Sequence, residues 1–107
     1  MSKTKIYNPI EQFGYEAKTT FWMDFSIADR FGVDGVKDTY KRAMDSWKND
    51  YIYLTELYMV LNHKIWQHYQ KNEALYNVYM ELFDKCGEYA TEHLKGEELS
   101  YFYTVTD

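Results

Sequence analysis

Histidine, cysteine and acidic side chains are the groups in this chain that could perform chemistry. His63 and His68 lie five residues apart, which on a helix places them about 140° from one another, so they do not face one ligand. Glu56 and His63 share a helix face but stand two turns apart. His93 and Cys86 both fall on the predicted core face of their helix, where a satisfied structural histidine and an inert buried thiol are the common cases.

The short motifs that bring metal ligands or catalytic groups together are missing from the sequence. It contains no His-Glu-x-x-His, no Glu-x-x-His pair of the di-iron type, no Cys-x-x-Cys and no glycine-rich phosphate loop. We therefore expect no catalytic residue, no metal site and no cofactor, and we expect a non-enzymatic protein.

A run of acidic residues near the carboxyl end has a more informative spacing. Four acids separated by three, four and four residues fall within one sector of about 80° on a helix, and we call them the acidic ridge: Glu81, Asp84, Glu88 and Glu92. Neighbours in such a row stand about 5–6 Å apart and repel one another. Lys85 is the one base nearby, and Glu97 and Glu98 could extend the ridge.

Two interpretations of the acidic ridge remain open. It is either a solvated face that keeps a small protein in solution, or a surface that docks on a basic groove or imitates the charge of nucleic acid. Four charges over eleven residues span about 15–16 Å, which is sparser than the one charge per ~1.7 Å of duplex DNA. Any imitation of nucleic acid would therefore be partial.

Aromatic residues make up 20% of the chain, and twelve of them are tyrosines. Most aromatic side chains belong in a core, but tyrosine and tryptophan also give large contact areas to partner proteins with few torsions to order. The aromatic candidates for a partner contact are Trp22, Tyr53 and Tyr76.

Charge and length restrict the class of protein further. The chain has 107 residues, enough for one domain spanning residues 1–107. Its net charge is −5, and residues 72–107 alone hold eight acids and two bases. An acidic chain is poorly suited to binding a phosphate backbone, so we expect a protein partner with a basic surface and no direct nucleic-acid binding. A single cysteine, no signal-peptide pattern and no membrane-length apolar run lead us to expect a cytoplasmic protein without a membrane partner.

The segment 51–69 is the element around which the other helices should pack. It lacks Gly and Pro, and apolar residues at spacings of three and four cover one face: Leu54, Leu57, Tyr58, Leu61, Ile65 and Tyr69. Ile52, Met59 and Trp66 form a second apolar strip. The remaining sector, predicted to be polar and narrow, consists of Glu56, His63, Lys64 and Gln67. A helix apolar over so much of its circumference must be covered on several sides.

The other predicted elements are helical, with two ambiguities. Helices are expected over a brief piece capped by Asn8, from about Asp24 to Gly32, over 35–48 after a cap at Asp34, and over 73–94 between Asn72 and Gly96. Residues 19–25 could instead form a strand, and the alternation in 99–106 favours an extended tail, although Glu97 and Glu98 could start another helical turn. Residues 36–69 could be one rod, but a break at Asn49-Asp50 is favoured. Residues 1–7 have few apolar anchors and are expected to be mobile.

Three segments carry a resemblance to other proteins: DFSIADRFG, YLTELYMVLNHKIWQHY and LKGEELSYFY. Together they resemble small uncharacterised accessory proteins of bacteriophages and integrating mobile elements, from about residue 20 to the end. The resemblance is one of overall pattern, so it assigns no functional residue. It implies a setting in which accessory proteins often counter host defence or adjust host machinery.

The sequence thus predicts an all-α fold, a compact bundle of three main helices with one or two short ones. The function that we expect is binding to, and inhibiting or modulating, a host protein, for example a nucleic-acid-handling defence protein in the manner of an anti-CRISPR. The alternative is a homo-oligomeric structural or accessory protein, such as a homodimer, whose surplus aromatic surface is its own subunit interface.

Overall fold

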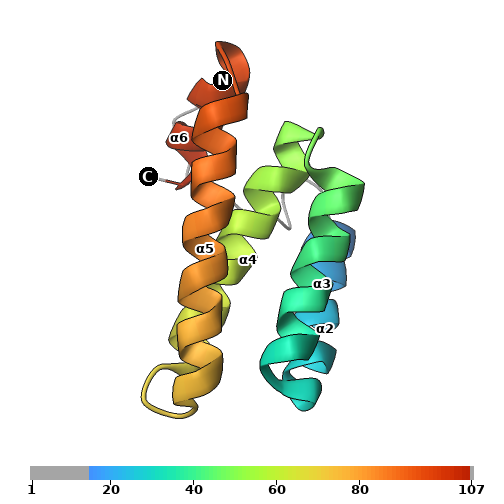
Figure 1. Cartoon of the computed structure of the whole chain (residues 1–107). Helices are drawn as coiled ribbons and strands as arrows, with labels where there is room; N and C mark the ends of the chain where they lie inside the picture. Colours follow the sequence, from blue (N-terminus) through green and yellow to red (C-terminus); the bar gives the residue numbers. More distant parts are fainter. Residues whose placement is uncertain (1–14, 107) are drawn as a thin grey trace.

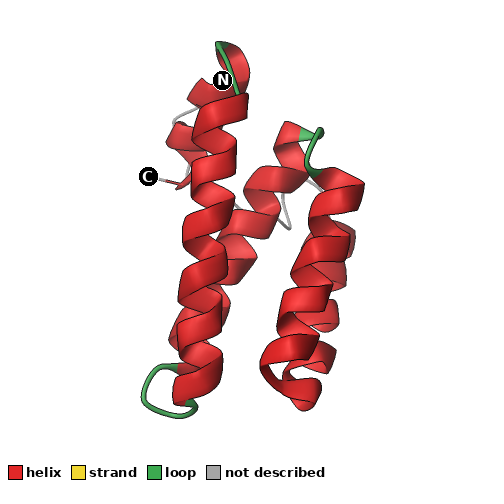
Figure 2. Cartoon of the chain, viewed as in Figure 1, coloured by secondary structure: helices red, strands yellow, loops and turns green. Residues whose placement is uncertain are grey.

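The computed structural model describes residues 15–106, and this part of the chain is helical with no strand (Figures 1 and 2). The elements are α2 (Tyr15–Ala28), the 3-10 helix η1 (Asp29–Phe31), α3 (Gly32–Trp47), α4 (Tyr51–His68), α5 (Glu73–His93) and α6 (Glu97–Thr106). The prediction of an all-α bundle is confirmed. The helical piece expected after Asn8 and the residues 1–7 expected to be mobile lie outside the described residues.

Helix α4 is the centre of the bundle, as the distribution of its apolar residues predicts. It contacts α2, α3, α5 and α6, and in Figure 1 it crosses behind α5. Leu54, Leu57 and Leu61 are fully buried on it. The Cα radius of gyration is 13.5 Å, close to the ~13 Å of a compact chain of 100 residues.

The polar sector predicted for this central helix is wrong at two positions. Glu56 and Lys64 are fully buried, whereas Trp66, assigned to the second apolar strip, is 62% exposed. Since nearly every side of α4 is apolar, its own pattern does not specify which strip faces a neighbour. The packing of α2 and α5 against it turns the Lys64 side inward and leaves Trp66 outside.

The chain breaks between α3 and α4, as favoured from Asn49-Asp50. Helix α3 ends at Trp47 and α4 begins at Tyr51. The side chain of Asp50 accepts hydrogen bonds from the backbone N–H groups of Ile52 (3.1 Å) and Tyr53 (3.2 Å). This cap satisfies two backbone donors that the first turn of α4 would otherwise leave open.

The boundaries of α5 also follow the sequence. The Asn72 side chain accepts from the N–H of Leu75 at 3.1 Å, and the helix ends at His93. Gly96 then adopts a φ of +57°, a conformation that glycine reaches without steric cost. These are local interactions, which is why the sequence locates both ends.

The amino-terminal half of the bundle differs from the prediction. Helix α2 runs from Tyr15 through Ala28, so residues 19–25 are helical and the helix starts before Asp24. Phe21, Phe25 and Ala28 are all buried. A helix places these three on one face, since they recur at intervals of four and three.

The start of α3 is corrected as well, because Asp34 is not its cap. Gly32 has a φ of +77°, which lets the chain turn from η1 directly into α3 at Gly32. Asp34 therefore lies inside the first turn of α3, where its negative charge interacts favourably with the helix dipole.

The carboxyl-terminal tail is helix α6 rather than an extended segment. Leu99 and Phe102 both pack against the core. A spacing of three brings them to one side of a helix but to opposite sides of a strand. A helix also satisfies its backbone hydrogen bonds internally, which matters because the described residues contain no strand with which this segment could pair.

The described helices include none that is both long enough and apolar enough to cross a membrane.

We predict that Gly35→Ala destabilises the protein, although alanine favours helices by about 1 kcal/mol over glycine. A Cβ at Gly35 would lie 2.7 Å from the Phe31 Cβ and 2.9 Å from the carbonyl oxygen of Ala28, so backbone must shift. We expect a loss of about 1–3 kcal/mol in the free energy of unfolding, measured by urea denaturation. Ser46→Ala, at an exposed α3 position, should change it by less than about 0.5 kcal/mol. A stabilising Gly35→Ala would show that α2 and α3 are not this close.

Candidate functional site

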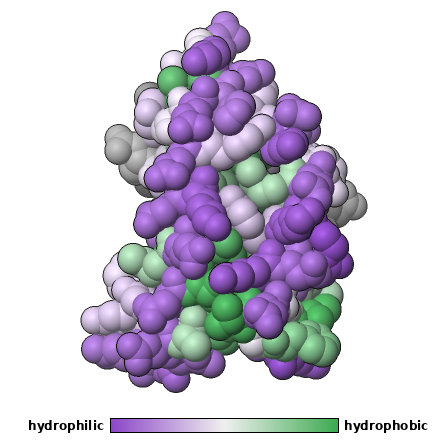
Figure 3. Space-filling view, viewed as in Figure 1, coloured by the Kyte–Doolittle hydropathy of each residue, from purple (hydrophilic) through white to green (hydrophobic). Residues whose placement is uncertain are grey.

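The acidic ridge lies on the solvent side of α5. Glu81, Asp84, Glu88 and Glu92 are all exposed. Hydrophilic side chains cover much of α5 on the face that Figure 3 shows. Glu97 and Glu98 are exposed in the first turn of α6, beyond the carboxyl end of α5. The helix thus presents the predicted row of carboxylates to solvent.

The charge of the ridge is scarcely neutralised by its surroundings. Lys85 Nζ lies 3.4 Å from Glu81 Oε2, an exposed pair one turn apart that contributes little. In the described part of the chain, Asp84, Glu88 and Glu92 form no salt bridge. Three adjacent carboxylates therefore face solvent without a paired cation among the described residues, and each repels the next by a few tenths of a kcal/mol.

A shallow pocket of about 370 Å³ adjoins the middle of the ridge, between α5 and α6. Asp84 and Glu88 line it together with Gly87. A Cβ at Gly87 would lie 3.0 Å from the Tyr58 ring, closer than most Cβ contacts. The missing side chain thus lets the Tyr58 ring of α4 lie directly against α5, beside the two carboxylates.

The three aromatic candidates lie on separate helices and are half-buried. Trp22 on α2, Tyr53 on α4 and Tyr76 on α5 each pack against the core. Tyr53 contacts the ring of Phe21, with 6.4 Å between centroids. Tyr76 precedes Glu88 by twelve residues, about 18 Å along the helix axis. The structure therefore does not gather these three rings at the acidic ridge, and their part in a contact stays a prediction.

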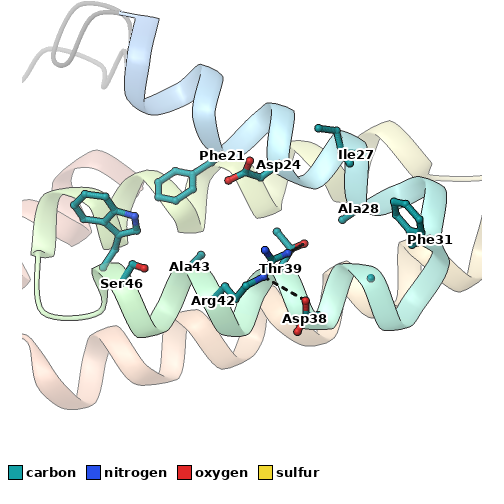
Figure 4. A pocket seen from close by; sticks show the side chains of 12 residues that line it. Phe21, Asp24, Ile27, Ala28, Phe31, Asp38, Thr39, Arg42, Ala43 and Ser46 are labelled. Carbon is teal, nitrogen blue, oxygen red and sulfur yellow. Dashed lines mark hydrogen bonds and ion pairs between the residues drawn. The ribbon is translucent and has the colours of Figure 1, made fainter.

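A groove of about 520 Å³ separates α2 from α3 (Figure 4). Its lining combines apolar side chains, such as Phe21, Ile27 and Phe31, with an ion pair of 3.2 Å between Arg42 Nε and Asp38 Oδ2. That pair and the one between Lys41 and Asp45 (3.3 Å) each join exposed side chains one turn apart on α3. Figure 3 places hydrophobic surface at the lower end of the molecule, where Figure 1 shows α2 turning into α3.

Four polar side chains, which we call the buried ion cluster, meet between η1, α4 and α5: Asp29, Lys64, His68 and Tyr79. Asp29 Oδ2 lies 2.7 Å from Lys64 Nζ and 2.9 Å from His68 Nε2. The Tyr79 hydroxyl donates to Asp29 Oδ1 at 2.5 Å. The His68 and Tyr79 rings stack with centroids 5.6 Å apart. One carboxylate thus receives polar groups from two helices.

The contacts of the buried ion cluster indicate a structural role. Burial, together with the hydrogen bond to Asp29 and its charge, raises the pKa of Tyr79 well above its ordinary value, so the hydroxyl stays protonated. Lys64 Nζ also lies 4.7 Å from the centroid of the Trp22 ring, a cation–π contact. Both carboxylate oxygens of Asp29 contact polar groups of α4 or α5, as expected for a side chain that joins helices.

Sequence reasoning missed this cluster, although a signal was present. Lys64 and His68 continue the spacing of Leu57 and Leu61, at intervals of four, three and four. They therefore share the buried face of α4. The charge of Lys64 places it in the predicted polar sector, although its spacing from Leu57 and Leu61 is also compatible with the buried face.

The other candidate groups are placed as follows. Cys86 is fully buried, as predicted, and burial raises its pKa to about 12. His93 is exposed, contrary to the predicted core position; its ring stacks on Tyr89 and Nδ1 lies 2.9 Å from the Tyr89 carbonyl oxygen. Within residues 15–106, no three His, Cys, Asp or Glu side chains are grouped so that they could hold a metal ion.

Comparison with known proteins finds no match to any family model, curated protein or solved structure.

We predict that Lys64→Met strongly destabilises the fold, because it leaves the Asp29 carboxylate buried without its ammonium partner. The expected loss in the free energy of unfolding is about 3–5 kcal/mol, measured by urea denaturation. Lys37→Met, at an exposed position of α3, should stay within about 0.5 kcal/mol of wild type. A Lys64→Met protein as stable as Lys37→Met would show that the ion pair has no structural role.

We predict that stability falls as the pH rises from about 9 to about 12. The pKa of Cys86 is raised from 9.0 to about 12 by burial, so the folded chain binds more protons than the unfolded chain in this range. A group with a pKa raised in this way lowers the free energy of unfolding by about 1.4 kcal/mol for each pH unit in this range. Urea denaturation at several pH values between 9 and 10 gives the free energy of unfolding as a function of pH. This free energy should fall less steeply with pH for Cys86→Ala than for wild type. Leu82→Ala, a core truncation without a titrating group, should keep the wild-type slope.

Proposed function

We propose that this protein is a non-enzymatic binding protein that docks on a basic surface of another protein through its acidic ridge. The observation that carries the proposal is the row of exposed carboxylates on α5, of which Asp84, Glu88 and Glu92 form no salt bridge in the described part of the chain. A cationic partner would relieve their mutual repulsion, and their charge would steer its approach.

The resemblance to accessory proteins of bacteriophages and mobile elements supports a host protein as the partner. A defence protein that handles nucleic acid is a suitable class, because it carries a basic surface for phosphates. The four carboxylates would occupy part of that surface and inhibit the host protein, in the manner of an anti-CRISPR. With a net charge of −5, the protein itself should not bind free DNA or RNA at physiological salt.

A second candidate, a homo-oligomeric accessory protein, is favoured by the apolar surface of α2 and η1. Met23, Ile27 and Phe31 recur every four residues, and each is more than half exposed, with Phe31 at 73%. Exposed apolar side chains that share one face are typical of a protein interface. A second copy of the chain would cover them symmetrically.

For the lead proposal, we predict that Glu88→Lys with Glu92→Lys slows association with the partner more than it speeds dissociation. Steering charges act mainly on the association rate, and salt should weaken binding of the wild type as it screens them. The partner is first captured from host lysate on immobilised wild-type protein. Rates are then measured by surface plasmon resonance at two salt concentrations.

The control pair is Asp34→Lys with Glu73→Lys, two exposed acids outside the ridge. Both double variants change the net charge equally, from −5 to −1, so a general charge effect would slow both. Slower association for the ridge pair alone supports docking at the ridge. Equal association rates for wild type and the ridge pair would remove the ridge from the mechanism.

For the second candidate, light scattering after gel filtration should give twice the chain mass at about 100 µM protein. Phe31→Glu should then restore the monomer, since it places a charge on the apolar surface. Trp66→Glu, a change at an exposed ring on α4, should leave the mass unchanged. A monomeric wild type at this concentration would argue against the homo-oligomer.

A further inference from the structure

The pocket between α5 and α6 has walls made of aromatic rings from three helices. Tyr58 stacks on Phe83 with 4.2 Å between centroids, and Phe102 lies 5.0 Å from Tyr58. The Tyr103 ring, 52% exposed, stands at the edge of the pocket, 6.0 Å from Phe102. Because Gly87 contributes no side chain, the half-buried Tyr58 ring lines the pocket beside the backbone of α5.

Two carboxylates border the same pocket. Asp84 and Glu88 are one helical turn apart, exposed, and without a salt bridge to any described residue. Among the residues that the structure describes, no basic side chain lines the pocket. Burial, the nearby Cys86 and the charge of Asp84 together raise the pKa of Tyr58 above its ordinary value. The pocket is therefore a region of negative potential with aromatic walls.

The other polar groups of the pocket also favour a hydrogen-bond donor as its occupant. The Thr91 hydroxyl donates to backbone carbonyl oxygens of α5, the shorter contact being 3.1 Å to Gly87, and that of Thr106 donates to the carbonyl oxygen of Phe102 at 2.7 Å. Each hydroxyl donates its proton to a hydrogen bond within its own helix, so it can offer only its lone pairs to a ligand. Rings, carboxylates and hydroxyls all present electron-rich surface.

We propose that this pocket binds an arginine side chain of the protein partner. The inference rests on the proposed function and adds the chemistry of the contact. A guanidinium group is planar, stacks on aromatic faces and offers five donors in a fork that two carboxylates can accept. A lysine ammonium also carries a charge, but it is more strongly hydrated and cannot stack.

The test uses a single arginine as the probe. The blocked tripeptide acetyl-Gly-Arg-Gly-amide is titrated into ¹⁵N-labelled protein, and amide chemical shifts are followed up to about 50 mM peptide. We expect saturable shifts centred on Gly87, Glu88 and Tyr103. The lysine tripeptide should bind at least about threefold more weakly, since it lacks the stacking contribution. The citrulline tripeptide, neutral but similar in shape, should leave these signals unchanged.

Two variants locate the bound side chain. Tyr103→Ala removes an exposed ring, and Glu88→Gln removes one charge without changing the shape of the pocket. Each should weaken binding of the arginine tripeptide at least about threefold. The matched controls are Tyr69→Ala, at an exposed ring of the α4–α5 loop, and Glu92→Gln, at a ridge acid that does not line the pocket. Both controls should bind the tripeptide as wild type does.

A second probe, hexalysine, separates this proposal from the docking role of the ridge. If hexalysine shifts the amides of Glu81 to Glu92 while the arginine tripeptide leaves the pocket unchanged, the pocket proposal fails and ridge docking stands. If the tripeptide fills the pocket while hexalysine leaves the ridge unchanged, the pocket stands and ridge docking fails. Equal binding of arginine and lysine tripeptides, unaffected by Tyr103→Ala, would overturn the pocket as an arginine site.

Discussion

The fold depends on the ion pair between Asp29 and Lys64, which joins the two halves of the bundle. Lys64 is fully buried, and an ammonium group at that depth requires a nearby negative charge. Asp29 supplies it from η1, the corner between α2 and α3, and also contacts His68 of α4 and Tyr79 of α5. Because a carboxylate and an ammonium can pair well in few geometries, the cluster restricts how that corner sits against α4 and α5, whereas apolar packing tolerates many arrangements.

A second close approach connects the core to the surface on which binding is proposed. Gly87 allows the Tyr58 ring of α4 to touch α5, and α6 then packs its buried Phe102 against the same ring. The pocket beside the acidic ridge is a consequence of this three-helix contact. Aromatic walls from three helices and two carboxylates of the ridge therefore come together at one place on the surface, which adds shape to the charge of the ridge.

The acidic ridge and the exposed apolar surface of Met23, Ile27 and Phe31 lie on different helices. The acidic ridge belongs to α5, whereas the exposed apolar residues Ile27 and Phe31 belong to α2 and η1. This separation lets a protein of 107 residues present two surfaces that substitutions can test independently.

Local sequence determined where helices end when a capping side chain or a single glycine marks the boundary. The break at Asn49-Asp50, the start of α5 after Asn72 and the buried position of Cys86 all follow from capping groups and a 3.6-residue period, which act within a few residues. The exposed acidic ridge follows from the same period. Tertiary structure decided the inward position of Lys64, the helical tail and the pocket at Gly87. Each depends on which neighbour covers a surface. Helix α4 is apolar on nearly every side, so its neighbours decide which side is buried. Phe102 is buried against the Tyr58 ring, and the absence of a side chain at Gly87 matters because that ring, on another helix, lies against it. A one-dimensional pattern does not contain those distances.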